Sequence, residues 1–342
     1  MKCKNKRHLL LGATLAIGIT AGLGLLQTAS AQAQVVIKFS HVAAVNTPKG
    51  QAAEQFKRLA EERSKGRVRV EIYPNSQLYK DKEELEALQL GAVQMLAPVP
   101  GKFGPMGVKE FEVFDLPYIF KDMDAVHNFT RGSGGAALLK KLDAKDVLGL
   151  AYWDNGFRVM SANKPIHTPT DMLGLKMRIN SSKVNASIMK SVGAMPQSLA
   201  FSEVYQALQT GVVDGTEGPL SNLYTQKQYE VQKHVTLSYH TISNYVVVVN
   251  KKFWEGLTPE LRTILEGAMK SATEYNNAIA AREEAEALAA IKQSGKTEVY
   301  DPTPKERAAW IKAMEPVYAE MSARVGGKIF VDAVRNSSQI TR

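Results

Sequence analysis

The sequence predicts an α/β protein of two lobes, each built from β-strands with flanking helices. Short β-branched runs alternate with stretches of helical spacing, an order that is typical of mostly parallel sheets. The alternation restarts at residue 148, which indicates a second lobe. A helical pattern then continues from residue 258 to about residue 292. Because few globular helices are that long, we expect a kink there or a helix that spans both lobes.

The first block is predicted to contain three strands separated by two helices. A helix is expected over 51–65, where apolar residues recur on one face and Gly66 ends the pattern. Asp81 resembles an N-cap with Glu84 three residues later, a capping box, and the helix that follows ends at Gly91. The expected strands cover 35–40, 68–73 and 93–99.

The second block repeats this organisation. Ser202 is predicted to cap a helix over 203–210, and Thr258 and Pro259 open the long helix as its N-cap and first residue. The expected strands cover 148–153, 174–179, 245–250 and a run that starts at 212–215.

One internal similarity favours two similarly built lobes. Residues 86–93 resemble residues 206–213, and both combine a helix end, a glycine and a strand start. Two lobes that face each other leave a cleft, which is where small-molecule sites tend to lie.

The N-terminus has the order of a secretory signal peptide. Four basic residues precede an uncharged apolar run over 9–26, and two small-x-small cleavage sites follow at 29–31 and 31–33. The alternative is an uncleaved membrane anchor, since the run approaches the length of a spanning helix. Cys3 precedes the run, so cleavage would leave a chain without disulfides, a thiolate nucleophile or cysteine metal ligands.

The charge of the chain does not favour nucleic-acid binding. Without the four basic residues of the N-terminal segment, the formal charge of +9 falls to about +5. The remaining basic residues are spread along the chain among acidic ones, which predicts solvated faces with a weak preference for anionic ligands.

Motifs of catalysis, cofactors and metals find little support. Gly295-Lys296-Thr297 lacks the upstream glycine of a phosphate-binding loop, and the spacing around Ser133 does not fit a nucleophile elbow. None of the histidines forms a His-Glu-x-x-His pair, so no zinc site is expected. We therefore expect a non-enzymatic protein without a cofactor or metal. An enzyme acting on a small acid remains the alternative, because distant residues can assemble a triad.

Two arginines are candidate ligands for an acid. Arg158 follows a predicted strand, and Arg178 lies near the end of another. In α/β lobes, ligands bind beyond the carboxyl ends of the strands, and a guanidinium meets a carboxylate with two parallel hydrogen bonds. Each arginine could instead be structural and paired with Asp or Glu.

The chain resembles the solute-binding subunit of the tripartite ATP-independent periplasmic (TRAP) transporters, of the DctP type. The matching stretches run in family order through nearly the whole mature chain, and together they are highly specific. They are Phe39-Ser40-His41-Val42, Thr47-Pro48-Lys49-Gly50, 73–78, 115–118, 155–158, 174–178, 201–209 and 213–219.

The resemblance implies a periplasmic binding protein of two lobes, each a mixed sheet flanked by helices, with a long helix across both and hinge-like closure on the ligand. Lobe I is expected over 34–155 with 244–283, and lobe II with the C-terminal helices over 156–243 with 284–342. Residues 1–33 are the expected signal peptide.

The resemblance also implies roles for individual residues. Arg178 corresponds to the arginine that holds the substrate carboxylate, and Arg158 to a second, more variable contact. His41 or Val42 would contribute from the first-strand loop. Further lining residues would be Ser181, Phe201 and His240.

One departure from the family concerns Gly218, where the family commonly has an asparagine that meets the ligand carboxylate. Glu217, Asn222 or water is expected to compensate, or the ligand differs in shape. Tyr245 is interpreted as a packing residue.

The loop at Thr47-Pro48-Lys49-Gly50 is most similar to the branch that binds C4-dicarboxylates such as malate, succinate and fumarate. The expected function is capture of such an acid in the periplasm and delivery to the membrane subunits of a TRAP transporter, by a monomer. Monocarboxylates, keto acids, sugar acids and a sensor role are the alternatives.

Overall fold

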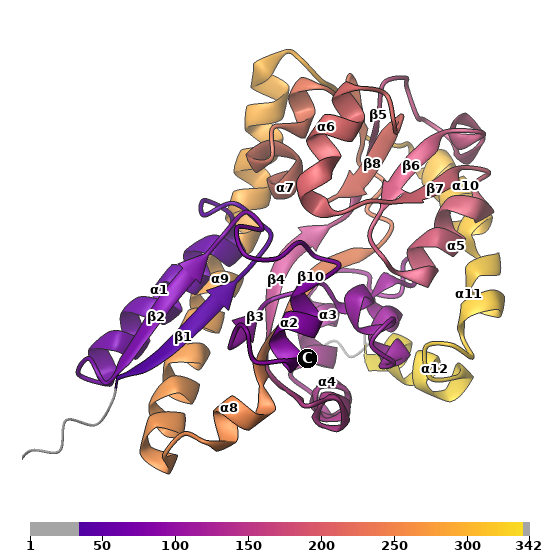
Figure 1. Ribbon diagram of the computed structural model, residues 1–342. Coiled ribbons are helices and arrows are strands. Elements are labelled where there is room, and N and C mark those ends of the chain that lie inside the picture. Colours follow the sequence, from indigo (N-terminus) through magenta and orange to yellow (C-terminus); the bar gives the residue numbers. More distant parts are fainter. Residues whose placement is uncertain (1–33, 338–342) are drawn as a thin grey trace, which may run out of the picture. The chain divides into compact units, whose positions relative to one another are not determined.

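The computed structural model describes residues 34–337, which form two mixed β-sheets with helices around them (Figure 1). The predicted signal peptide lies outside the described residues. Among residues 34–337 there is no helix long and apolar enough to cross a membrane.

The first sheet has the strand order β2-β1-β3-β10-β4. Strand β1 pairs in parallel with β2 and β3, whereas β10 runs antiparallel to both β3 and β4. The strands are β1 (Val35–Ser40), β2 (Val68–Tyr73), β3 (Met95–Leu96), β4 (Val147–Phe157) and β10 (Ile242–Asn250).

The second sheet has the order β11-β9-β5-β8-β6-β7. The pairs β6–β7, β6–β8 and β9–β11 are parallel, and β5 is antiparallel to β8 and β9. Its strands are β5 (Val159–Ala162), β6 (Lys176–Ile179), β7 (Met195–Ser198), β8 (Gly215–Gly218), β9 (His234–Thr236) and β11 (Glu298–Tyr300). The expectation of mostly parallel sheets is therefore too simple, because returning strands enter both sheets in the opposite direction.

Helices flank both sheets (Figure 1). The α-helices are α1 (Pro48–Arg63), α2 (Glu84–Gln89), α3 (Met123–Thr130), α4 (Ser133–Lys140), α5 (Lys183–Ser191), α6 (Val204–Gln209), α7 (Leu220–Thr225), α8 (Lys251–Glu255), α9 (Pro259–Ser294), α10 (Pro304–Met314), α11 (Pro316–Met321) and α12 (Lys328–Ser337). Short 3₁₀ helices cover η1 (Pro100–Phe103), η2 (Lys109–Asp115), η3 (Lys141–Lys145), η4 (Pro169–Met172), η5 (Phe201–Glu203) and η6 (Gln228–Glu230).

The long helix predicted from residue 258 is confirmed as α9. The Thr258 side chain accepts a hydrogen bond from the amide of Leu261, Pro259 occupies the first turn, and Gly295 ends the helix with a positive φ of 64°. Helix α9 packs on α1 and β4 near the first sheet and on α7 near the second (Figure 1).

Glu284 joins the long helix to the second half of the molecule. Its carboxylate accepts hydrogen bonds from the amides of Leu220 and Ser221, at 3.0 and 2.7 Å, and so supports the start of α7. Burial raises the pKa of Glu284 to about 7. A Cβ at Gly156 would lie 2.6 Å from this carboxyl group, so only glycine lets β4 approach α9 here.

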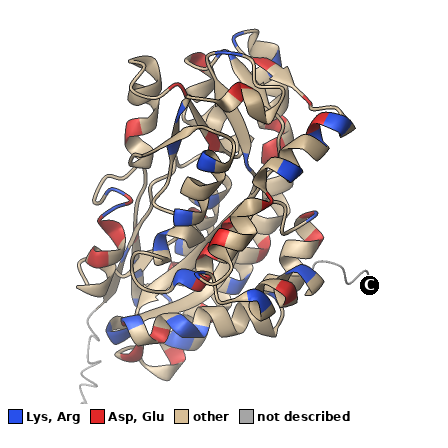
Figure 2. Ribbon diagram, turned by 90° about the vertical axis from the view of Figure 1, so that its right-hand side faces the viewer, with Lys and Arg blue, Asp and Glu red and all other residues tan. Residues whose placement is uncertain are grey.

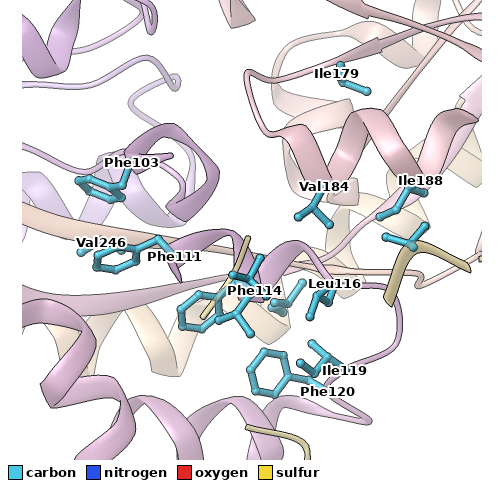
Figure 3. Packing of buried hydrophobic residues seen from close by; sticks show 14 of the residues in the cluster. Phe103, Phe111, Phe114, Leu116, Ile119, Phe120, Ile179, Val184, Ile188 and Val246 are labelled. Atoms are coloured by element: carbon cyan, nitrogen blue, oxygen red, sulfur yellow. The ribbon is translucent and has the colours of Figure 1, made fainter. Parts of the chain in front are cut away.

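The largest apolar cluster crosses from one half of the chain to the other. Figure 3 shows Phe111 of η2 near Phe103 and Val246, and across the same cluster Val184 and Ile188 of α5. A second cluster fills the space between the first sheet, α1 and α9. Burial on this scale is the main source of stability for a chain without described disulfides.

The C-terminal helix does not stay with the second sheet. Helix α12 packs on α3, and Phe330 contacts Phe129 at a ring-centroid distance of 6.3 Å. Helix α3 lies in the segment expected as lobe I, whereas α12 lies in residues 284–342, which were expected in lobe II. This contact therefore joins the two expected lobes. The exact lobe boundaries stay a prediction.

Two predicted helix caps are wrong. Helix α2 begins after Glu83 and α6 after Glu203, and neither has a side-chain cap. The Asp81 carboxylate lies instead beside the Lys102 ammonium, 3.3 Å away, because both side chains are buried and need a partner of opposite charge. Ser202 lies inside the 3₁₀ turn η5, two residues before α6 begins at Val204.

Two predicted strands are shorter than expected. The run 93–99 contains only β3, and the run that starts at 212 becomes strand β8 only from Gly215. In both places, bends after the helix-ending glycine take up the first residues.

Candidate functional site

A cavity lies where residues of the two sheets meet. Its volume is about 50 Å³, several times the roughly 10–15 Å³ that one buried water requires. Four basic side chains line it, among polar and aromatic groups. The lining residues are Val42, Ala43, Lys49, Asp81, Val99, Lys102, Arg158, Arg178, Asn180, Phe201, Thr216, Glu217, Gly218, Pro219, Asn222, Leu223, Gln228, Ser243 and Tyr245.

The folding pattern explains why these residues converge. Strand β6 carries Arg178 one residue before its end, and the parallel neighbour β8 ends with Glu217 and Gly218. On the other side, the chain leaves β1 and passes Val42 before it enters α1. Carboxyl ends of parallel strands are the usual position of ligands in α/β sheets.

A tight turn fixes Lys49 at the cavity. Thr47 caps α1 by accepting a hydrogen bond from the amide of Gly50 at 3.1 Å. A Cβ at Gly50 would lie 2.3 Å from the carbonyl oxygen of Val45, so glycine is required for the loop to fold back on the helix. This contact places the first turn of α1, and with it Lys49, against the cavity.

Arg158 is held by carboxylates. Its Nη1 lies 2.8 Å from both carboxylate oxygens of Glu217, and its Nη2 lies 3.7 Å from Asp115. Burial works to lower the pKa of Arg158, but the two carboxylates outweigh it, so the pKa is raised. Burial raises the pKa of Asp115 to about 7. Arg158 thus has the internal partners that the structural interpretation requires.

Arg178 has a different environment. Its Nε and Nη2 donate to the carbonyl oxygen of Leu199, at 3.1 and 2.9 Å, and the Phe201 ring lies 5.7 Å from Cζ. The closest described carboxylate, that of Asp81, is 3.9 Å away. Burial is the main reason that the pKa of Arg178 is lowered. Its Nη1 makes no hydrogen bond within residues 34–337, so donors remain for an anion in the cavity.

The two lysines differ in the same way. Lys102 Nζ lies 2.8 Å from Glu84 and 3.3 Å from Asp81. Lys49 Nζ donates to the carbonyl oxygen of Ala97 at 3.1 Å and lies 3.9 Å from the centre of the Tyr245 ring. Burial is the largest cause that lowers the pKa of Lys49, to about 7.

Most residues singled out from the sequence lie at this cavity. Six of them line it, together with Val42, the alternative to His41 in the first-strand loop, and they come from separate segments of the chain. The six are Arg158, Arg178, Phe201, Glu217, Gly218 and Asn222.

Three further candidates lie outside the lining. His41 and His240 are buried, and burial lowers their pKa values to about 3 and about 4. His240 Nδ1 lies 2.8 Å from the Ser238 hydroxyl oxygen. Ser181 follows Asn180, and it is Asn180 that lines the cavity. Successive side chains of an extended chain point in opposite directions. An error of one residue in the alignment with the family therefore selects Ser181 where Asn180 lines the cavity.

Sequence reasoning missed several lining residues. Lys49 belongs to the stretch Thr47-Pro48-Lys49-Gly50 that resembles the family. Its charge beside a tight turn was the signal that could have identified it as a lining residue. Lys102 and Asp81 carried no pattern that distinguishes them from surface charges. Tyr245 was interpreted as packing, but its ring lines the cavity and its hydroxyl accepts a hydrogen bond from Asn155 Nδ2 at 2.7 Å.

Other sites offer less chemistry. A larger groove of about 800 Å³ lies between α9 and the α3–α4 region, but it does not gather buried charges of one sign. No group of three or more potential metal ligands exists within residues 34–337.

Comparison with known proteins identifies the family. Residues 39–324 match the model of bacterial extracellular solute-binding protein, family 7. The chain belongs to this family. The predicted fold class, of two mixed sheets with a long helix as in the TRAP solute-binding proteins, is thereby confirmed.

Similar proteins cover nearly the whole chain. The C4-dicarboxylate-binding periplasmic protein DctP of Rhodobacter capsulatus is 59% identical over 313 residues, which are 91% of this chain and 94% of that protein. A TRAP periplasmic solute-binding protein from Shewanella oneidensis, solved with bound succinate, has a TM-score of 0.88 and 42% identity over 90% of this chain and all (100%) of that chain. A relative from Pseudomonas aeruginosa with bound L-malate has a TM-score of 0.81 and 39% identity, over 84% and 99% of the two chains.

Proposed function

We propose that this member of family 7 captures a C4-dicarboxylate such as succinate, malate or fumarate in the periplasm and delivers it to the membrane subunits of a TRAP transporter. One observation carries the proposal. The cavity combines a buried guanidinium that has spare donors with three further basic side chains in a small volume. The names and bound ligands of the similar proteins support the same substrate class.

Arg178 is the proposed anchor of one carboxylate. A planar guanidinium and a planar carboxylate form charge-assisted hydrogen bonds, each contributing about 1.5–3 kcal/mol. Two such bonds with a few neutral contacts are enough for micromolar binding, about −8 kcal/mol. The Phe201 ring, 5.7 Å from Cζ, adds a cation–π contact on the same guanidinium.

Binding is proposed to stabilise a closed arrangement of the lobes, because a ligand in this cavity touches residues of both sheets. Three neighbouring residues already connect the two sides. Lys80 pairs with Glu203 at 2.7 Å, Asp81 accepts from the amide of Phe201 at 3.3 Å, and Lys82 donates to the carbonyl oxygen of Ser198 at 3.4 Å. A closed form that depends on the ligand is what a membrane partner can recognise.

Gly218 adds space at the position where the family often has asparagine. A Cβ built there meets no heavy atom within 4 Å. Asn222 and the Glu217–Arg158 pair line the same part of the cavity. We propose that these groups or water satisfy the ligand there.

The remaining assignments complete the proposal. The protein binds without chemical conversion, acts as a monomer and reaches the periplasm by a cleavable signal peptide over residues 1–33. Basic and acidic residues are interspersed in the view of Figure 2, so that face offers no continuous patch for a polyanion.

A ligand panel tests the function. The purified protein, without residues 1–33, is first unfolded and refolded to remove any acid retained from the host. It is then titrated calorimetrically with succinate, malate, fumarate, pyruvate, butyrate and galactonate. Micromolar or tighter binding of a C4-dicarboxylate, with weaker binding of the others, is expected. Preferential binding of a monocarboxylate, keto acid or sugar acid would replace the substrate, and turnover of a bound acid would favour an enzyme.

A further inference from the structure

We propose that Lys49 receives the second carboxylate of the ligand and is the residue that makes the site selective for dicarboxylates. The inference rests on the proposed function. It assigns the part of the cavity that faces the first sheet to the second carboxylate of the ligand. It follows from which cations of the cavity are neutralised by the protein itself.

Two of the four basic side chains are already matched by carboxylates. Arg158 contacts Glu217 at 2.8 Å, and Lys102 contacts Glu84 at 2.8 Å, with a second carboxylate nearby in each case. All four of these side chains are at most about one-twentieth exposed, so water screens these pairs little. These two cations have little charge left to offer a ligand.

The other two basic side chains are not matched in this way. No described carboxylate lies within 4 Å of Lys49 Nζ, and the one near Arg178 is 3.9 Å away and shared with Lys102. Both use a backbone carbonyl oxygen as their main partner. Lys49 belongs to α1 beside the first sheet and Arg178 to β6 of the second. A dianion is the ligand whose charge and two-ended shape fit this pair.

Lys49 is also held in a defined position. Its side chain is buried, its Nζ donates to Ala97 and it lies over the Tyr245 ring. The Tyr245 hydroxyl is in turn fixed by Asn155. An ammonium has three donors, so two N–H groups remain for a carboxylate. Such preorganisation reduces the entropy that binding loses.

The charged groups around Lys49 leave it short of negative charge. Burial is the largest effect that disfavours its protonation and Lys102 adds to it, whereas Glu84 and Asp81 favour the proton. Lys49 in turn disfavours protonation of His41. The balance lowers the pKa of Lys49 to about 7. A carboxylate beside Nζ supplies the missing partner and favours the charged ammonium.

The test compares a dicarboxylate with a matched monocarboxylate. Succinate and butyrate are titrated into the wild-type protein, Lys49→Met and Lys57→Met at pH 7. Lys57 lies on the same helix but outside the cavity lining, so Lys57→Met controls for the loss of a lysine from α1. Methionine keeps the length and apolar stem of lysine without the charge. Thermal unfolding of each empty variant checks the fold.

We expect Lys49→Met to weaken succinate binding about a hundredfold, the effect of losing one or two charge-assisted hydrogen bonds. Butyrate affinity should change less than about threefold, so the preference for the dicarboxylate collapses. Lys57→Met should bind both acids like the wild type.

Three results would overturn the assignment. Unchanged succinate binding by folded Lys49→Met would remove Lys49 from the site while leaving the proposed function intact. An equal loss for both acids would show a general packing role and no selection. If the wild type bound no C4-dicarboxylate at all, the proposed function and this inference would fall together.

Discussion

The two walls of the cavity are built on the same plan. The wall beside the first sheet holds Lys102, which is neutralised by two acidic residues, and Lys49, which has only a carbonyl oxygen and an aromatic ring. The opposite wall holds Arg158, at the junction of β4 and β5, again with two acidic partners, and Arg178 of β6, whose close partner is the Leu199 carbonyl oxygen.

Within each wall, the cation with acidic partners serves stability, and the cation with neutral partners serves binding. A buried cation with its carboxylates in place maintains the fold, and removing it leaves uncompensated negative charge. A buried cation with neutral partners costs stability by desolvation and keeps donors for a ligand. A protein therefore holds such a group at a functional site at the expense of the empty state.

Replacing each of the two arginines singly by alanine should have the largest effects, and the two effects should differ in kind. Arg178→Ala should lower succinate affinity at least about a hundredfold, because two charge-assisted bonds are lost, and leave the fold intact. Arg158→Ala should instead destabilise the protein by about 3–5 kcal/mol, since Glu217 and Asp115 stay buried without a cation. Calorimetric titration and urea unfolding measure the two effects. Tight succinate binding by Arg178→Ala would contradict the site.

Lys102→Met tests the paired cation of the other wall. Glu84 and Asp81 would remain buried without their ammonium, which should reduce the free energy of unfolding by about 3–5 kcal/mol. The empty protein is followed by urea unfolding, so ligand affinity does not enter the result. A stability equal to that of the wild type would show that these carboxylates do not depend on Lys102.

Lys49→Met should have the opposite effect on the empty protein and stabilise it. The pKa of Lys49 is about 7 in the fold and near 10.5 when unfolded, so between these pH values the unfolded chain binds more protons. The free energy of unfolding of the wild type consequently rises with pH above about 7. Below pH 7 the full free-energy cost of burying the charged Lys49 side chain remains. The gain from Lys49→Met, on the order of a few kcal/mol, should be largest at pH 6 and shrink toward pH 9.5. Urea unfolding at these pH values measures it, and a gap that widens with pH would refute the assignment.

Lys80→Ala should have the smallest effect. Its ion pair with Glu203 connects the two sides of the cavity at 2.7 Å, but the side chains are 51% and 44% exposed. Exposed pairs contribute little and are screened by salt. Succinate affinity should fall less than about fivefold at low salt, and the difference should vanish at high salt. A large loss of affinity would assign this contact a part in closure that its exposure does not suggest.

Periodic and local signals predicted the elements of the fold well. The N-cap at Thr258, the helix that follows it and the two α/β blocks are confirmed by the structure. Caps inferred from spacing alone failed at Asp81 and Ser202. At Asp81 a competing partner in the folded chain, Lys102, decides where the side chain bonds.

The sequence by itself determined the fold class and, through its ordered motifs, the family. It also pointed to both arginines that line the cavity and to the loop after the first strand. Only the tertiary structure decided which cations are neutralised. Arg158 and Arg178, or Lys49 and Lys102, have the same formal charge in the sequence, and nothing in their local spacing reveals the acidic residues that face them. Glu217 lies 59 residues from Arg158 and Glu84 lies 18 residues from Lys102. Electrostatic pairing depends on distance in space and on burial, and the packing of distant segments sets both.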